Sequence, residues 1–128
     1  MGSFQDENNQ GQIYRDEHLA VDFRLQRAML DSRPLALTRK EYDLLALMVQ
    51  HAGEIIPREA LLMRVWGYGA DIRTRTLDVH IRRLRKKMGT LADQYIETIF
   101  GIGYRFQPFH APRFFDSEIN RPLLAVTA

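Results

Sequence analysis

The sequence contains no cysteine among its 128 residues. This absence excludes disulfides, thiolate metal sites and a cysteine nucleophile, so packing alone must stabilise the fold. The sequence also lacks any apolar run near the roughly 20 residues that cross a bilayer, and its start, MGSFQDENNQGQ, is polar rather than signal-like. We therefore expect a cytoplasmic protein without membrane contacts, whose apolar fraction of 45% suffices for the core of one domain.

Recognisable catalytic motifs are also missing. The sequence has no serine elbow, P-loop or HExxH motif, and its four histidines are too far apart to show metal-ligand spacing. The glycines of Gly101-Ile102-Gly103 are weak evidence for a nucleotide site, because no phosphate-cradling helix follows them. The sequence therefore predicts a protein that is not an enzyme and that needs no cofactor or metal.

Charge is distributed unevenly along the chain. The net charge is only +2, but the pI is about 9.1. The first quarter of the sequence holds a group of acids, namely Asp6, Glu7, Asp16, Glu17, Asp22 and Asp31. The segment RTRTLDVHIRRLRKKMG at 73–89 instead holds seven basic residues and one acid, Asp78. One end of the fold is therefore expected to be positive.

The first third of the chain reads as a linker followed by a small sheet. Residues 1–12 are polar and aperiodic, as in a flexible linker or a leftover of an expression vector. Short apolar pieces then alternate with polar pairs and an Asp31–Pro34 turn, which predicts an antiparallel meander. The expected strands are Ile13-Tyr14, Leu19–Val21, Ala28–Leu30 and Leu35–Leu37.

Three helices are expected next. Thr38 and Glu41 form a capping box that begins the first helix, and Gly53 ends it. Its apolar stripe comprises Tyr42, Leu45, Met48, Val49 and Ala52. Pro57 opens a second helix, Arg58 to Trp66, after the extended Ile55-Ile56 link. That helix turns Leu61, Leu62 and Val65 inward.

The basic segment is the third helix, and Gly89 caps it. A hairpin is expected from Tyr95–Ile99 and Tyr104–Phe106 around the glycine turn. Residues 107–128 contain three of the five prolines and read as an irregular tail. The ordered domain is thus expected to span residues 13–106.

The third helix has two contrasting faces. At about 100° per residue, Leu77, Ile81, Leu84 and Met88 fall within about 40° of one another and must face the core. The opposite side carries Arg75, Val79, Arg82, Arg83 and Lys86. Asp78 can pair with Arg82 at the i,i+4 spacing, but that pair would leave most guanidinium groups without a local counter-charge. Either this face is merely solvated, or it enters the major groove of DNA.

A helix, a loop, a basic helix and a glycine-turned hairpin together form the layout of a winged helix-turn-helix. Over residues 13–106 the sequence resembles the DNA-binding effector domains of OmpR/PhoB-type response regulators. The motifs that carry this resemblance are LTRKEYDLL at 37–45, REALLMRVWG at 58–67, RTLDVHIRRLRKKMG at 75–89 and ETIFGIGYRF at 97–106. It implies an α+β fold with an N-terminal four-stranded antiparallel sheet, three helices and a C-terminal β-hairpin wing at 99–104.

The resemblance also implies a site, with 75–88 as the recognition helix. The implied DNA-binding residues are Trp66, Arg73, Arg75, Thr76, Val79, His80, Arg82, Arg83, Arg85, Lys86, Thr98 and Tyr104. Val79 and Arg83 match base-reading positions, and the others match phosphate or groove-edge contacts. Trp66 could instead belong to the core, and the hydroxyl of Thr98 could sit unused on a strand. His80 could be an ordinary surface histidine, and Tyr104 could pack under the hairpin. Before the glycine turn the family commonly carries an arginine, whereas this sequence has Phe100, with Arg105 as a conceivable substitute.

The resemblance further implies partners. Double-stranded DNA, typically as tandem direct repeats, is the main one. The loop after the second helix matches a segment through which relatives contact RNA polymerase, and it comprises Gly67, Tyr68, Gly69, Ala70, Asp71 and Ile72. Full-length relatives carry a receiver domain that a sensor kinase phosphorylates, so we expect an excised effector domain, although a free-standing regulator is an alternative. A winged-helix module for protein contacts is the competing function.

Overall fold

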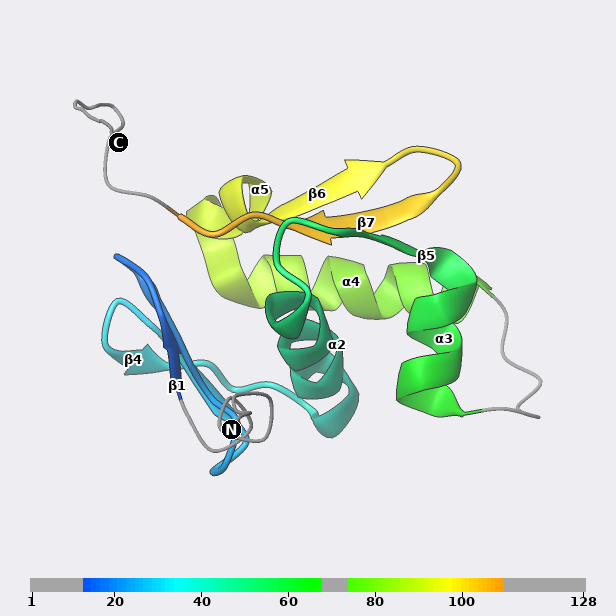
Figure 1. The fold of residues 1–128 in the computed structure, drawn as a ribbon. Coiled ribbons are helices and arrows are strands. Elements are labelled where there is room, and N and C mark those ends of the chain that lie inside the picture. The colour runs from blue at the N-terminus through cyan, green and yellow to red at the C-terminus, as the bar shows by residue number, and fades with distance from the viewer. Residues whose placement is uncertain (1–12, 68–73, 110–128) are drawn as a thin grey trace, which may run out of the picture.

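The computed structural model describes residues 13–67 and 74–109 (Figure 1). The expected linker at 1–12, most of the expected polymerase loop and residues 110–128 of the expected tail lie outside these ranges. Within them the fold is the expected α+β arrangement, with a four-stranded sheet, three main helices and a C-terminal hairpin.

The N-terminal sheet is the expected antiparallel meander, in the order β1-β2-β3-β4. Its strands are β1 (Ile13–Arg15), β2 (Leu19–Asp22), β3 (Arg27–Leu30) and β4 (Arg33–Pro34). Leu19, Val21 and Ala28 point into the core, because alternate residues of a strand face the same side. The inner face of the sheet is therefore apolar, whereas the outer face mixes apolar residues such as Ile13 and Met29 with Arg15, Asp22 and Arg27.

The fourth strand starts earlier than the sequence predicted. We expected it at Leu35–Leu37, but β4 consists of Arg33–Pro34. Asp31 and Ser32 both adopt left-handed backbone conformations, with φ of 50° and 67°. Two such residues close a tight hairpin, so pairing resumes at once between Leu30 and Arg33. The expected four-residue turn was too long.

Helix α2 (Arg39–Gln50) begins at the predicted capping box. The amide of Glu41 donates to Oγ1 of Thr38 at 3.3 Å, and the amide of Thr38 donates back to Oε1 of Glu41 at 2.9 Å. The helix ends at His51 rather than at Gly53, so Ala52 is exposed instead of joining the apolar stripe. Gly53 has φ of 87°, and its amide donates to the carbonyl of Phe106. The left-handed turn thus fastens the end of α2 to the hairpin.

The second and third helices match their predictions closely. Helix α3 (Arg58–Trp66) starts directly after Pro57, and α4 covers Thr74–Met88. The α4 residues Leu77, Ile81, Leu84 and Met88 are all 2% exposed or less. The predicted core stripe of the basic helix is confirmed.

The segment after α4 contains structure that the sequence reading missed. A 3₁₀ turn, η1 (Gly89–Leu91), leads into a short helix, α5 (Ala92–Tyr95). Tyr95 therefore ends a helix instead of starting a strand, and its ring is fully buried. The hairpin consists of β6 (Ile96–Ile99) and β7 (Gly103–Phe106).

The presumed link before α3 is also a strand. Strand β5 (Ile55–Pro57) pairs with β7, which gives a three-stranded sheet in the order β5-β7-β6. A Cβ at Gly103 would lie 2.0 Å from the carbonyl oxygen of Ile56. Glycine at this position is therefore required for β5 to approach the hairpin.

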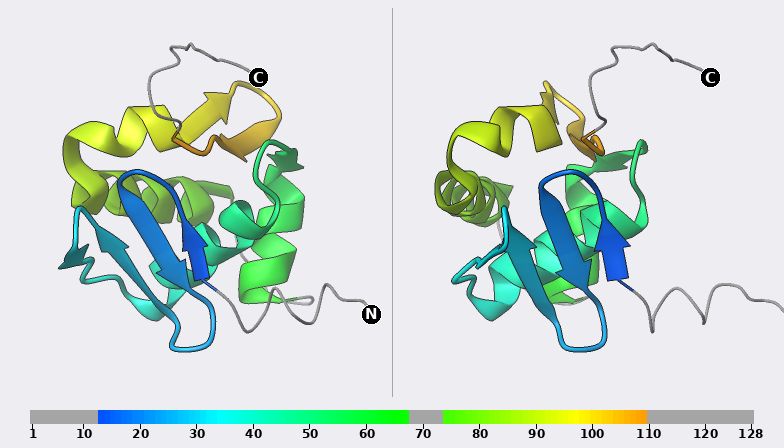
Figure 2. Two further views of the ribbon diagram at one scale, coloured as in Figure 1. Left: turned by 60° about the vertical axis from the view of Figure 1, so that its left-hand side comes forward. Right: turned by 90° about the vertical axis from the view of Figure 1, so that its left-hand side faces the viewer.

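The helices lie between the two sheets (Figures 1 and 2). The N-terminal sheet covers one side of α2, and the hairpin lies along α4 on the other side of the helical layer. Buried Glu41 of α2 accepts a hydrogen bond from Nζ of Lys87 on α4 at 2.6 Å. This ion pair adds a polar tie to the apolar contact between the two helices.

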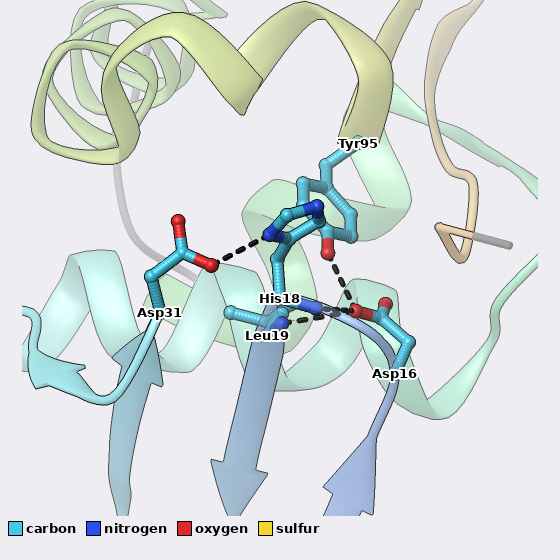
Figure 3. A network of polar contacts seen from close by, with 5 residues as sticks. All are labelled: Asp16, His18, Leu19, Asp31 and Tyr95. Atoms are coloured by element: carbon cyan, nitrogen blue, oxygen red, sulfur yellow. Dashed lines mark hydrogen bonds and ion pairs between the residues drawn. The ribbon is translucent and has the colours of Figure 1, made fainter. Parts of the chain in front are cut away.

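A single carboxylate joins the N-terminal sheet to the C-terminal part of the chain (Figure 3). Oδ1 of Asp16 accepts hydrogen bonds from the amides of His18 and Leu19, both at 2.9 Å, and from the hydroxyl of Tyr95 at 2.6 Å. Its Oδ2 accepts from the hydroxyl of Tyr14 and from the amide of Phe109. Residues up to Phe109, beyond the expected boundary at 106, thus contact the domain.

Candidate nucleic-acid interface

The outer face of α4 is cationic. Arg75, Arg82, Arg83 and Lys86 are exposed, Val79 is half-buried among them, and Thr76 and His80 are half-buried at the border of this face. Because the opposite face is packed into the core, α4 cannot rotate to hide these groups. The structure therefore places seven predicted site residues on or beside one surface.

Asp78 does not form the pair with Arg82 that its i,i+4 spacing allows. Its carboxylate forms an ion pair with the guanidinium of Arg58, the first residue of α3, and accepts a hydrogen bond from the hydroxyl of Tyr104 at 2.7 Å. Asp78 lies about 100° from Leu77 around the helix axis, which turns it toward α3 and the hairpin rather than outward. Within the described residues, Arg82 forms no ion pair.

The environment of Asp78 keeps it charged. Partial burial opposes ionisation, but the hydrogen bonds from Arg58 and Tyr104 outweigh it and lower the pKa of the carboxyl. Burial and the nearby carboxylate raise the pKa of Tyr104 in turn. The one acid of α4 is therefore neutralised by a residue of α3, and it does not weaken the outer positive face.

Arg85 also turns inward. Its Nη2 donates to the carbonyl of Ile96 at 2.9 Å and to Oγ1 of Thr98 at 2.7 Å. The guanidinium carbon lies 5.6 Å from the ring centroid of Tyr104, a distance suited to a cation–π contact. Three predicted site residues, Arg85, Thr98 and Tyr104, thus come together, and they join α4 to β6 and β7.

Trp66 and His80 meet on the other flank of α4. Their rings pack edge to face with centroids 5.0 Å apart, and Nδ1 of His80 lies 2.8 Å from the carbonyl of Thr76. Nζ of Lys40 lies 5.8 Å from the Trp66 ring and donates to the carbonyl of Val65. Trp66 is half-buried, so it has both a packing contact and an open edge.

The hairpin turn is apolar at its tip. Phe100 is 88% exposed and Ile102 is 51% exposed. Nε and Nη2 of Arg105 donate to Oε1 of Glu97 at 3.0 and 2.9 Å. Arg105, the conceivable substitute for the arginine that the family carries at position 100, is therefore already paired. Gly67 is the C-cap of α3. Arg73 and the rest of the predicted polymerase loop lie outside the described residues.

Two partners were missed by the sequence reading. Arg58 neutralises Asp78 from 20 positions away, and Glu41 binds Lys87 from 46 positions away. Helical spacing places Asp78 and Lys87 on the flanks of α4, but it does not identify what packs there. Both contacts arise from tertiary structure.

The described part of the chain offers little else in the way of sites. In residues 13–67 and 74–109, no three His, Asp or Glu side chains come close enough to hold a metal ion. None of the helices in those ranges is sufficiently long and apolar to cross a bilayer.

Comparison with known protein families gives a match over most of the folded region. A family model described as "Transcriptional regulatory protein, C terminal" matches residues 32–106. The response regulator ArlR of Staphylococcus saprophyticus is 39% identical over 87 residues, which cover 67% of this chain and 40% of ArlR. The chain spans about 40% of the length of such curated relatives.

Solved structures show the same fold. The response regulator DrrB of Thermotoga maritima, described as an OmpR/PhoB homologue, superimposes with a TM-score of 0.71 at 29% identity, over 79% of this chain and 46% of DrrB. The DNA-binding domain of Klebsiella pneumoniae RstA, solved in complex with the RstA box, gives a TM-score of 0.68 at 33% identity, over 77% of this chain and 99% of that domain. This chain therefore belongs to the family of C-terminal effector domains of OmpR/PhoB-type transcriptional regulatory proteins.

Proposed function

We propose that this chain is the sequence-specific, double-stranded DNA-binding effector domain of a two-component response regulator. One observation carries the proposal: the outer face of α4 exposes Arg75, Arg82, Arg83 and Lys86, while the acid of the same helix is neutralised internally by Arg58. An α-helix fits the major groove of B-DNA, where arginine binds guanine bidentately. The RstA domain with the same fold was solved on its own DNA box, which supports this reading.

The residues divide into two roles under this proposal. Arg83 and Val79 read bases, because they stand at the positions to which the family resemblance gives this role. Border groups contact phosphates and fix the register. They are Trp66, Arg73, Arg75, Thr76, His80, Arg82, Lys86 and Thr98. Arg85 and Tyr104 hold the hairpin against α4, a role that their internal contacts favour over direct phosphate binding.

A salt titration tests DNA binding directly. The chain should bind a duplex selected from a random library, and affinity should fall steeply with salt, since each neutralised phosphate releases counterions. Arg82→Ala should weaken binding to selected and random duplexes alike, whereas Arg83→Ala should lose about 1–3 kcal/mol on the selected site only. Arg33→Ala is the matched control, because Arg33 is an exposed arginine on the distant sheet. Absence of duplex binding at low salt would refute the proposal.

The partners of the longer relatives belong to the same proposal. Because the chain spans about 40% of those relatives, a receiver domain and a sensor kinase are expected to act with it in the cytoplasm. Two domains on one face of DNA require half-sites about one helical turn apart. Library selection should therefore return tandem direct repeats, and a selected site without a repeat would contradict this part. RNA polymerase contact through 67–72 is testable by loop substitutions that reduce transcription but not DNA binding.

A further inference from the structure

The tip of the hairpin exposes two large apolar side chains. Phe100 is 88% exposed, and Ile102, two residues along the same turn, is 51% exposed. Turns at a protein surface are normally polar, because apolar groups there gain nothing from burial in the free protein. The side chains therefore contribute little to the stability of this fold.

The tip is held in a fixed shape. The amide of Ile102 donates to the carbonyl of Ile99 at 2.9 Å, which closes the turn. The carbonyl of Ile102 accepts from the amide of Arg58 at 3.0 Å, which ties the turn to the start of α3. Behind the tip, Gly103 fits closely against Ile56 of β5. The apolar groups are thus presented on a preorganised element.

The tip is also fixed relative to α4. Arg85 of α4 binds Thr98 of β6, and Asp78 of α4 binds Tyr104 of β7. These contacts lie on both strands of the hairpin, so the hairpin keeps a fixed position beside α4. Under the proposed DNA-binding function, on which this inference rests, the tip would reach the duplex beside the bound major groove.

The chemistry of the hairpin decides what the tip can contact there. Arg105 is the only basic residue of 96–106, and its guanidinium is paired with Glu97. The tip therefore offers no free cation to phosphates. The apolar surfaces of DNA at the backbone edge are deoxyribose rings and, where a base step opens, base faces. Apolar side chains inserted into the minor groove act on such steps.

We propose that Phe100 inserts into the minor groove beside the α4 site and packs against sugars and a partly unstacked base step. This contact selects sequence by deformability: pyrimidine–purine steps such as TA or CA open easily, whereas stiff A-tracts with a narrow minor groove resist entry. Phe100 is then a specificity-determining residue for the flank of the site.

The test uses a duplex with one selected half-site, so that no second copy of the chain can bind beside the first. Phe100→Ala should weaken binding about five- to tenfold on a TA-flanked duplex and leave the salt dependence unchanged, because no charge is lost. Phe100→Arg should steepen the slope of log K against log salt by roughly one and move the preference toward an A-tract flank. 2-Aminopurine in the flanking step should brighten with wild-type protein but not with Phe100→Ala.

Both variants change an exposed side chain, so unfolding midpoints equal to wild type should confirm that they fold. Equal affinity of wild type and Phe100→Ala for the TA-flanked duplex, with no 2-aminopurine response, would overturn the proposal while DNA binding itself stands. A loss that occurs only on tandem sites would also overturn it, since Phe100 would then contact the neighbouring copy. No duplex binding by the wild type would instead refute the proposed function.

Discussion

Among the partly exposed carboxylates, Asp16 should be the one whose removal lowers the free energy of unfolding most. It accepts five hydrogen bonds, and one donor is the hydroxyl of fully buried Tyr95. Asp16→Ala leaves the hydroxyls of Tyr95 and Tyr14 without an acceptor, while the amides of His18 and Leu19 in the turn can still reach water. At about 1–2 kcal/mol for each stranded hydroxyl, the expected loss in the free energy of unfolding is about 2–4 kcal/mol. Urea unfolding followed by the fluorescence of the single tryptophan, Trp66, measures it.

Asp16→Asn separates charge from hydrogen bonding. The asparagine side chain keeps one acceptor oxygen, but its NH₂ group replaces the second and faces hydrogen-bond donors. A tyrosine hydroxyl can turn to accept a hydrogen bond from this group, whereas the backbone N–H of Phe109 can only donate. We expect a loss of about 1–2 kcal/mol. Partial burial opposes ionisation of Asp16, but the hydrogen bonds from Tyr14, Tyr95 and the turn amides lower its pKa below 3.8. The wild-type advantage should therefore be present above about pH 4 and disappear as pH falls through the lowered pKa.

The control for this series is Glu17→Gln, an exposed carboxylate on the same turn. It should change the free energy of unfolding by less than about 0.5 kcal/mol. The reasoning fails if Asp16→Ala costs no more than Glu17→Gln. It also fails if the stability difference between the wild type and the Asp16→Asn variant does not shrink as the pH is lowered through the acid range.

Two further substitutions test the packing. Gly103→Ala should separate β5 from β7, because the added Cβ would lie 2.0 Å from the Ile56 carbonyl oxygen. A loss of about 2 kcal/mol or more in urea unfolding is expected, and a smaller loss would mean that the strands shift freely. Glu41→Ala should cost about 3 kcal/mol, because it removes the carboxylate that accepts from the amide of Thr38 in the capping box and is also the buried partner of Lys87. If a Glu41→Ala, Lys87→Ala double variant is no more stable than Glu41→Ala, an unpaired ammonium is not the cause.

The parts of the fold that the sequence predicted are those governed by local rules. The capping box at Thr38 and the four-residue core stripe of α4 depend only on positions a few residues apart, and both are confirmed. The tight Asp31-Ser32 turn was misjudged because neither residue is glycine, yet both adopt positive φ. Strand β5 was read as a link because three residues become a strand only through pairing with β7. Helix α5 is too short to show an apolar period.

The candidate site shows the same division between local and tertiary information. The exposure of Arg82 and Arg83 follows from the helical period, and the structure agrees. The helical period does not identify the partner of Asp78. Two arginines compete for its carboxylate: Arg82, four residues along the exposed face, and Arg58, which is half-buried beside Tyr104. The tertiary pair forms, since fewer water molecules compete for it and a second donor supports it.

This division changes the expected salt dependence. Helix α4 has six basic residues, Arg75, Arg82, Arg83, Arg85, Lys86 and Lys87. Arg85 and Lys87 are bound internally to Thr98 and Glu41, so four remain for phosphates and bases. At about 0.9 for each phosphate contact, α4 should contribute at most about 3.6 to the slope of log K against log salt, not about 5.4. Lys86→Gln should reduce the slope by about 0.9 where Lys86 contacts a phosphate, and Lys87→Gln should leave the slope of the folded protein unchanged. If Lys86→Gln and Lys87→Gln reduced the slope equally, DNA would have to draw Lys87 away from the buried carboxylate of Glu41. Pairing within the fold would then not determine which charges α4 presents to DNA.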